Sequence, residues 1–429
     1  RGAAPSMGAS TADGGRARAL LDSDGDILIY LHVDAAEPTL LPKLEKLVSE
    51  AAEGADEEGD GPRAGMSGDD MEQALASLGM MATDVDELGV SLSIDETAIS
   101  WVGESVVRSG SAFAIQAETP NVSLQRVASL PGDAFVASIG QYSGRALQAS
   151  LEQSLAGSPK EVADVVTAMF GAIPGDYVGE VASVIGFSDT AMVDVVFEIP
   201  LEGASPLAFE NALSDVVVAV AASISDDLDK ALGKTSEAGD DVERPDVDVD
   251  VVAMIEDMEA EYSLGSVKGW RVALPAELLE QEAEPVATLL PSHIGIWFSA
   301  VEDDAYLVIA PTPEAAATSI ESYREPGVVV GDRLPESLTA VLTQEGIGAF
   351  VMSPNMLFKG IVRMAGAAVP EMQAFGAFVN FLPDEYGIAA VTSNRGDGQS
   401  SIGAIDAADL APLVQFGAMA FASMRAPGR

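Results

Sequence analysis

The sequence predicts an α+β protein built from duplicated strand–helix–strand–strand units, with antiparallel sheets and helices packed on one face. Two observations predict this class. Short apolar or alternating runs typical of strands recur along the chain, separated by longer stretches with helical periodicity. Several consecutive strands are also joined by very short polar or glycine-containing segments, such as Gly265-Ser266 and Glu302-Asp303-Asp304. These connections are too short for a parallel crossover and indicate hairpins.

The predicted elements follow one another in a regular order. The strands are expected at 26–33, 89–94, 98–102, 135–139, 190–199, 259–264, 267–274, 294–301, 305–310, 346–352, 386–392 and 399–406. The helices are expected at 39–52, 70–81, 144–155, 159–172, 206–232, 275–289, 312–323, 354–381 and 407–424. Ser205 and Thr312 are the predicted N-caps of two of these helices, and Pro313 suits a first helical position.

A short motif, Leu-Pro followed by a small or acidic pair, precedes four apolar runs that we interpret as strands. The copies begin at Leu130, Leu290, Leu334 and Leu382, and Ser23-Asp24-Gly25-Asp26 resembles a degenerate fifth copy. Proline ends a preceding helix and fixes the approach to a strand. The recurrence favours internal duplication, although Leu-Pro is also a common pair before strands and chance is the alternative.

Two acidic segments rich in glycine and like charges divide the chain. Residues 50–70 are interpreted as a surface insertion and 233–248 as a linker, because such composition favours solvated loops. The expected organisation is therefore a flexible lead at 1–20, a first α+β domain at 21–232 and a second at 249–429.

Charge and hydropathy exclude several classes of protein. The chain carries 22 basic and 68 acidic residues, a formal net charge of −46, with 48% hydrophobic residues. That apolar content argues against disorder. The charge argues against nucleic acid and anionic membrane surfaces as partners. An acidic, lysine-poor surface suits a salt-rich or extracellular setting; a high-GC genome is the other explanation for this composition.

The absence of cysteine removes disulfides, thiolate metal sites and thiol nucleophiles. No run of about 20 apolar residues predicts a membrane-spanning helix. The sequence begins at Arg1 with a Gly/Ala/Ser-rich stretch. We interpret that start as either the processed end of an exported protein, located in the periplasm, at the cell surface or outside the cell, or a truncation.

Two groups of aspartates are candidate calcium ligands, since hard cations prefer several carboxylates on a short segment. The first is Asp22, Asp24 and Asp26, and the second is Asp246, Asp248 and Asp250 on an alternating run. An EF-hand is excluded for the first group, because Ile27 and Val33 occupy the positions that require glycine and glutamate. Solvated turns or a frayed edge strand are the alternatives, and no other cofactor is predicted.

No catalytic set is recognisable. His32 and His293 are the two imidazoles, and no Gly-x-Ser-x-Gly nucleophile elbow is present. Both histidines are therefore expected to be structural. Trp101, Trp270 and Trp297 fall in alternating strands, where core packing is expected. The methionine- and phenylalanine-rich helix at 354–381 is expected to pack in the core, with a groove for a hydrophobic ligand as the alternative.

The strand–helix pattern with Leu-Pro-acidic strand starts, from Ser23 to Met424, resembles uncharacterised bacterial exported proteins, often of lipoprotein type. This resemblance implies export and carries no known chemistry or functional residues to this chain.

We therefore expect a non-enzymatic exported protein that acts by protein–protein contact. It would serve as an envelope or surface binding protein, or as a self-assembling structural component. One alternative is a carrier of a lipid or another hydrophobic ligand. A further alternative is a metal- or carboxylate-dependent hydrolase.

Overall fold

A computed structural model of the chain describes residues 25–32, 85–95, 97–146, 178–187, 193–200, 255–273, 293–368, 379–396 and 398–413, with isolated positions at 149, 210–211 and 376. The strands in the main sheet are β1 (Ile27–His32), β2 (Val85–Ile94), β3 (Ala98–Val107), β5 (Val136–Ser143), β6 (Val178–Phe187), β7 (Val193–Pro200), β8 (Ile255–Tyr262), β9 (Gly265–Ala273), β10 (His293–Val301), β11 (Asp304–Ala310), β13 (Gly348–Met352), β14 (Ile388–Arg395) and β15 (Gly398–Asp406).

The helices among these residues are α4 (Ala112–Gln116), α10 (Pro313–Arg324), α11 (Glu336–Leu342) and α12 (Pro354–Ala368), with 3₁₀ turns η2 (Gln125–Ser129) and η4 (Val330–Arg333). Two short strands, β4 (Val122–Ser123) and β12 (Glu345–Gly346), pair beside the main sheet. A helical segment also follows β15 at residues 407–413.

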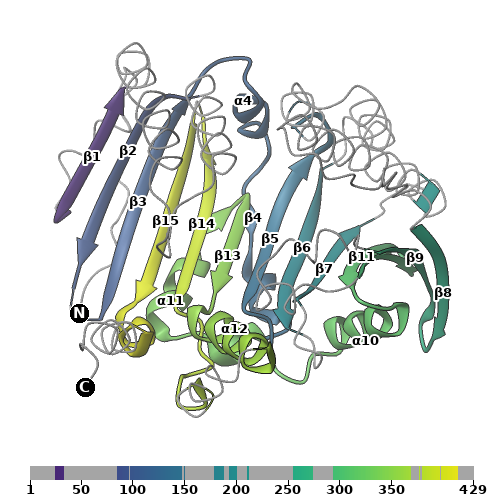
Figure 1. The fold of residues 1–429 in the computed structure, drawn as a ribbon. Coiled ribbons are helices and arrows are strands. Elements are labelled where there is room, and N and C mark those ends of the chain that lie inside the picture. The colour runs from purple at the N-terminus through teal and green to yellow at the C-terminus, as the bar shows by residue number, and fades with distance from the viewer. Residues whose placement is uncertain are drawn as a thin grey trace, which may run out of the picture.

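The strands form one sheet in the order β1-β2-β3-β15-β14-β13-β5-β6-β7-β11-β10-β9-β8 (Figure 1). Every neighbouring pair is antiparallel. The predicted α+β class with antiparallel pairing is confirmed, with strands predominating. β13, β14 and β15 lie between β3 and β5, so the parts of the chain before and after 233–248 contribute strands to the same sheet. The division into two domains stays a prediction.

The strand order contains four sets of three consecutive strands that are neighbours in the sheet, which we call meanders; β8 extends one of these sets, because it pairs with β9. They are β1-β2-β3, β5-β6-β7, β9-β10-β11 and β13-β14-β15. We call the first strand of each meander its leading strand and the third its closing strand. Closing strands meet at β3–β15 and β7–β11, whereas leading strands meet at β13–β5. Successive meanders along the sheet therefore alternate in direction.

The local sequence explains where α10 begins. Thr312 has an extended backbone, and its hydroxyl accepts a hydrogen bond from the Ala315 N–H at 3.2 Å. Pro313 occupies the first turn, where its missing N–H costs nothing. The predictions for Thr312 and Pro313 are confirmed, whereas the predicted N-cap Ser205 lies outside the described residues. Ala316, Ala317, Ile320 and Tyr323 then share the buried side of the helix.

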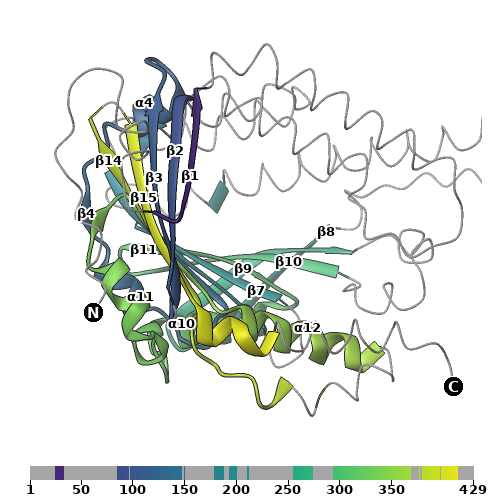
Figure 2. The same ribbon diagram turned by 90° about the vertical axis from the view of Figure 1, so that its left-hand side faces the viewer.

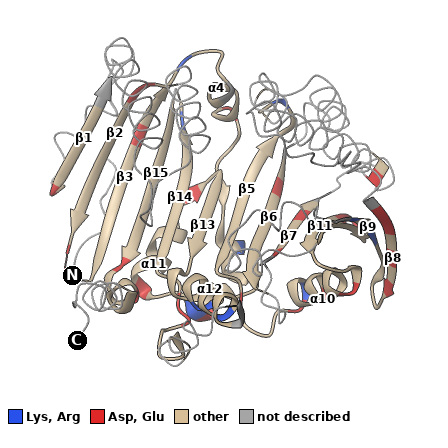
Figure 3. Cartoon of the chain, in the orientation of Figure 1, with Lys and Arg blue, Asp and Glu red and all other residues tan. Residues whose placement is uncertain are grey.

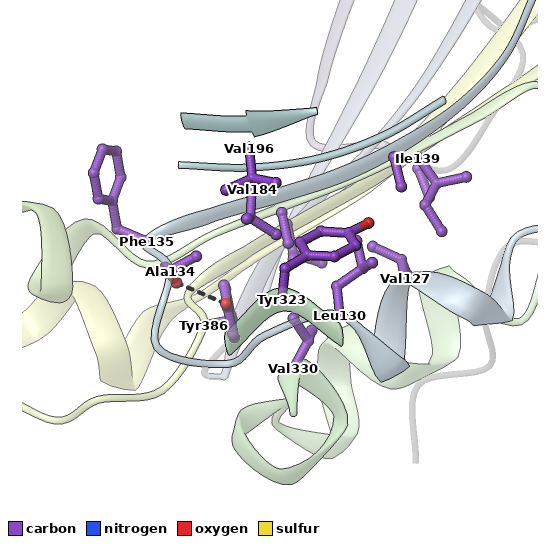
Figure 4. Packing of buried hydrophobic residues seen from close by; sticks show 14 of the residues in the cluster. Val127, Leu130, Ala134, Phe135, Ile139, Val184, Val196, Tyr323, Val330 and Tyr386 are labelled. Carbon is purple, nitrogen blue, oxygen red and sulfur yellow. Dashed lines mark hydrogen bonds between the residues drawn. The ribbon is translucent and has the colours of Figure 1, made fainter. Parts of the chain in front are cut away.

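The main core lies between the sheet and the helices α10 and α11. The sheet contributes buried valines to this core, namely Val196 of β7, Val308 of β11 and Val351 of β13. The helices contribute Ile320 of α10 and Leu338 of α11. Figure 2 shows α10 and α11 on the same side of the sheet. Figure 4 shows this packing from close by, with the Tyr386 hydroxyl donating to the Ala134 carbonyl oxygen at 2.7 Å. Several of the predicted helices lie outside the described residues, so one-sided helix packing stays a prediction for them.

One predicted strand was wrong, and one strand of the main sheet was not predicted. The run after Leu334-Pro335 is α11 and not a strand, because Leu338, Val341 and Leu342 recur at helical spacing and are buried together. β6 was missed, since its glycines and Glu180 weaken the strand pattern. The Leu-Pro copies also precede different kinds of element: β5 is a leading strand, β14 is a middle strand, and α11 is a helix. The motif therefore does not mark equivalent positions in the meanders.

Candidate functional site

A cluster of ionisable side chains lies between β7 and α10. Residues 194, 196 and 198 of β7 share the sheet face that α10 covers. Glu198 is 6% exposed, and its carboxylate accepts hydrogen bonds from the Tyr323 hydroxyl, at 2.7 Å, and from the Arg126 guanidinium. Arg126 also donates to Glu180 at 2.6 Å. One buried carboxylate thus connects α10, β7 and the turn η2.

Burial and the Glu198 charge shape the ionisation of the tyrosines in this cluster. Desolvation and the neighbouring carboxylate raise the pKa of Tyr306 to about 12. The same two causes raise the pKa of Tyr323 further. Both phenols therefore remain protonated at neutral pH, and the Tyr306 and Tyr323 rings pack edge to face at 5.8 Å. The Tyr323 hydroxyl is used as a donor to Glu198 and is not poised to accept a proton.

The chemistry of this cluster is that of a support for α10. Glu198 of β7 is buried beneath the helix, Tyr323 lies on the buried side of the helix, and their polar atoms bond to one another. Arg126 is the partly exposed member, with its side chain 39% accessible. A charge-assisted network of this kind holds elements together when its members are satisfied. The sequence analysis missed it. Its signal was present, because Asp194 and Glu198 are two acids on one face of an otherwise apolar strand.

Asp194 lies near this network, on the same face of β7. Its carboxylate accepts a hydrogen bond from the Ser319 hydroxyl of α10 at 3.1 Å. Burial raises the pKa of Asp194 to about 6, against the effect of that hydrogen bond. The fold therefore favours the protonated carboxyl group, and its ionisation lowers the stability of the folded state.

We expect the D194N variant to be more stable than the parent protein at pH 7.5 and equal to it near pH 4. Because the folded pKa of Asp194 lies above its usual value of 3.8, its stabilising contribution is complete below that value and is lost as the pH rises through about 6. The difference at pH 7.5 should be ~1–2 kcal/mol, because Asp194 is only partly buried and solvent screens part of the effect. Urea unfolding at both pH values measures it. A constant difference between the two proteins at both pH values would contradict the prediction.

A second buried polar pair joins α12 to the segment after β15. The Asn355 side chain is fully buried and donates to both the backbone oxygen and the carboxylate of Asp409, at 2.8 and 2.5 Å. Asp409 is 2% exposed, and burial raises its pKa to about 6. Lys359 of α12 donates to Asp384 at 2.5 Å. The Asn355–Asp409 contacts fix the C-terminal helical segment against α12, and the Lys359–Asp384 pair joins α12 to the segment before β14.

The candidate calcium ligands are mostly outside the described residues, namely Asp22, Asp24, Asp246, Asp248 and Asp250. Asp26 is described, and its carboxylate accepts a hydrogen bond from the Ile94 N–H at 2.6 Å. Within the described ranges, no group of three or more acidic or histidine side chains is arranged to hold a metal ion. The calcium sites stay predictions.

The two histidines lie at separate places in the sheet. His32 is opposite Glu87 in the β1–β2 register, and His293 is opposite Ala273 at the start of β10. The predicted core role of the tryptophans is confirmed for Trp270 and Trp297, which are 8% and 0% exposed, whereas Trp101 is partly exposed. Met356 of α12 packs in the main core.

The two end strands of the sheet differ sharply in composition. β1 reads ILIYLH and contains no acidic or basic residue except its terminal histidine. Ile27 and Ile29 are 45% and 53% exposed. β8 reads IEDMEAEY, and Figure 3 shows its acidic residues beside the basic residues of β9. Glu256 bonds to Arg271, and Glu259 lies 3.8 Å from Lys268. Acidic side chains protect β8 from pairing with another strand, and β1 lacks them.

No helix among the described residues is long and apolar enough to cross a membrane. No protein-family model matches the sequence, and comparisons with curated proteins and with solved structures find no match.

Proposed function

We propose that this protein is an exported, non-enzymatic protein that acts by contact with another polypeptide, at the β1 edge of its sheet. The observation that carries the proposal is the apolar end strand β1, which pairs with β2 and with no other described strand. An exposed strand edge offers backbone hydrogen bonds to an added strand, and its side chains provide specificity.

The buried ionisable groups support a contact function over a reaction. In the part of the chain that the structure describes, Glu198 bonds to side chains of its own fold, and so does Asp409. Such groups stabilise helix positions on the sheet. The alternative functions are a carrier of a hydrophobic ligand and a carboxylate- or metal-dependent hydrolase.

The composition supports an exported and salt-exposed setting. The net charge of −46 makes copies of the chain repel one another at low ionic strength. At 1 M salt the screening length is about 3 Å, so contact between acidic molecules becomes possible.

We propose also that the four meanders are copies of one ancestral three-strand unit. Their shared neighbour order and the symmetric way in which they meet support this.

Photo-crosslinking in the organism that produces the protein tests the contact function. A photoreactive amino acid at position 29, where the native isoleucine is exposed, should form covalent adducts with a polypeptide. The same residue at position 259, on the acidic β8 edge, is the matched control and should form few adducts. Adducts at position 259 equal to those at 29, or none with any polypeptide at 29, would overturn the proposal.

A further inference from the structure

The interior of the sheet shows how two leading strands meet. β5 and β13 are both leading strands, and they pair antiparallel. Ala137 lies opposite Val351 and Ile139 opposite Ala349. All four side chains are 3% exposed or less. Each strand thus presents an alanine and a branched residue two positions later, and antiparallel pairing places each alanine against the other strand's branched residue. The junction is close to two-fold symmetric about Ser138 and Phe350.

The other two leading strands lie at or near the ends of the sheet. β9 is followed at the end by β8, so its outer edge is already paired. β1 is the end strand on the other side, and its one described neighbour is β2. β5 and β13 pair with each other through their outer edges, and the outer edge of β9 pairs with β8. β1 is the remaining leading strand, and no described strand pairs with its outer edge.

The backbone of β1 is oriented for such a junction. The Asp95 N–H donates to the oxygen of Ala98 in β3 at 3.0 Å. In an antiparallel sheet, successive residues of a strand direct their backbone N–H and C=O groups alternately to the two neighbouring strands. Asp95 therefore bonds toward β3, and Leu92 and Val90 direct their backbone groups toward β1. Their register partners are Ile27 and Ile29. The intervening Leu28 therefore directs its N–H and C=O away from β2, toward the outer edge.

We propose that β1 pairs antiparallel with β1 of a second copy of this chain, so that one sheet continues through a two-fold symmetric dimer. The inference rests on the proposed contact function and names its partner. A second copy fits this edge because β1 presents no carboxylate of its own between Ile27 and Leu31. The acidic β8 edge would instead bring like charges together.

Cysteine crosslinking tests the dimer directly, because the chain contains no cysteine and each variant carries a single thiol. In a two-fold antiparallel junction centred near residue 29, the two copies of that residue have Cα atoms about 4.5–5.5 Å apart. That separation lies within the range of about 4.4–6.8 Å that a disulfide requires. The full-length I29C variant in 1 M KCl should therefore form a covalent dimer under mild oxidation.

The matched control is I294C. Ile294 is also an exposed isoleucine, at 39%, but it lies in β10 between β9 and β11. It should crosslink at least about tenfold more slowly at the same protein concentration.

A second variant, I29C with L28P, places proline where the N–H points outward, which an edge strand tolerates. This variant should stay folded by circular dichroism and lose most of the crosslinking.

Equal crosslinking of I29C and I294C would overturn the dimer, and so would a parent protein that sediments as a monomer at every concentration in 1 M KCl. Crosslinking that persists in the folded L28P variant would also overturn it. Adducts in the producing organism from position 29 to a different protein would leave the contact function standing while the dimer fails.

Discussion

Replacing Glu198 with alanine is expected to lower the free energy of unfolding by about 3 kcal/mol. The change removes the acceptor of the Tyr323 hydroxyl and one of the two carboxylates that hold Arg126. Tyr323 is buried, so water cannot replace the lost partner at its hydroxyl group. The partly exposed Arg126 can recover some solvation, which keeps the expected loss below that of a fully buried charge pair.

Chemical denaturation of E198A and of two companion variants measures this effect. Y323F removes one hydrogen bond and should cost about 1–2 kcal/mol. E302A breaks a pair with Arg324 in which the glutamate side chain is 75% accessible, and it should cost less than about 1 kcal/mol. If E198A were as stable as the parent protein, the cost of burying the carboxylate would equal the gain from its bonds. The network would then not be what holds α10 on β7.

The sequence predicts most strands correctly because their signals are local. β10 and β11 are short apolar runs joined by an acidic turn, and the predicted hairpin at β14 and β15 is also present. The α10 cap is another local signal, since Thr312 and Pro313 both contact the first turn. Such features depend on neighbouring residues alone.

The strand order could not be predicted, because it depends on pairs that are distant in the chain. Phe350 faces Ser138 and Ile402 faces Val102, and no local pattern specifies either pair. Glu198 illustrates the same limit for the buried network. Its place in an apolar strand indicates an unusual buried charge, but its partners Arg126 and Tyr323 come from elements on either side of it in the sequence.

Replacing Trp297 with alanine is expected to cost about 3–5 kcal/mol of stability, the range for large aromatic truncations in a core. Trp297 is fully buried, and its indole N–H donates to the Ala310 oxygen at 2.7 Å. The ring lies against two glycines: a Cβ atom on Gly295 would be 2.4 Å from it, and one on Gly269 would be 2.9 Å away. Glycine has no side chain, so neither of these two positions can fill the cavity that the truncation of Trp297 leaves.

The W101A variant is the matched control for this prediction. Trp101 also lies against a glycine of the neighbouring strand, Gly403, but it is partly exposed, so its truncation should cost clearly less. A loss for W297A no larger than that for W101A would contradict the prediction. Trp297 is in β10, near the end of the sheet opposite to β1. A W297F change in the I29C background should therefore lower stability and leave the crosslinking rate of the folded protein unchanged, which separates the stability of the sheet from contact at its edge.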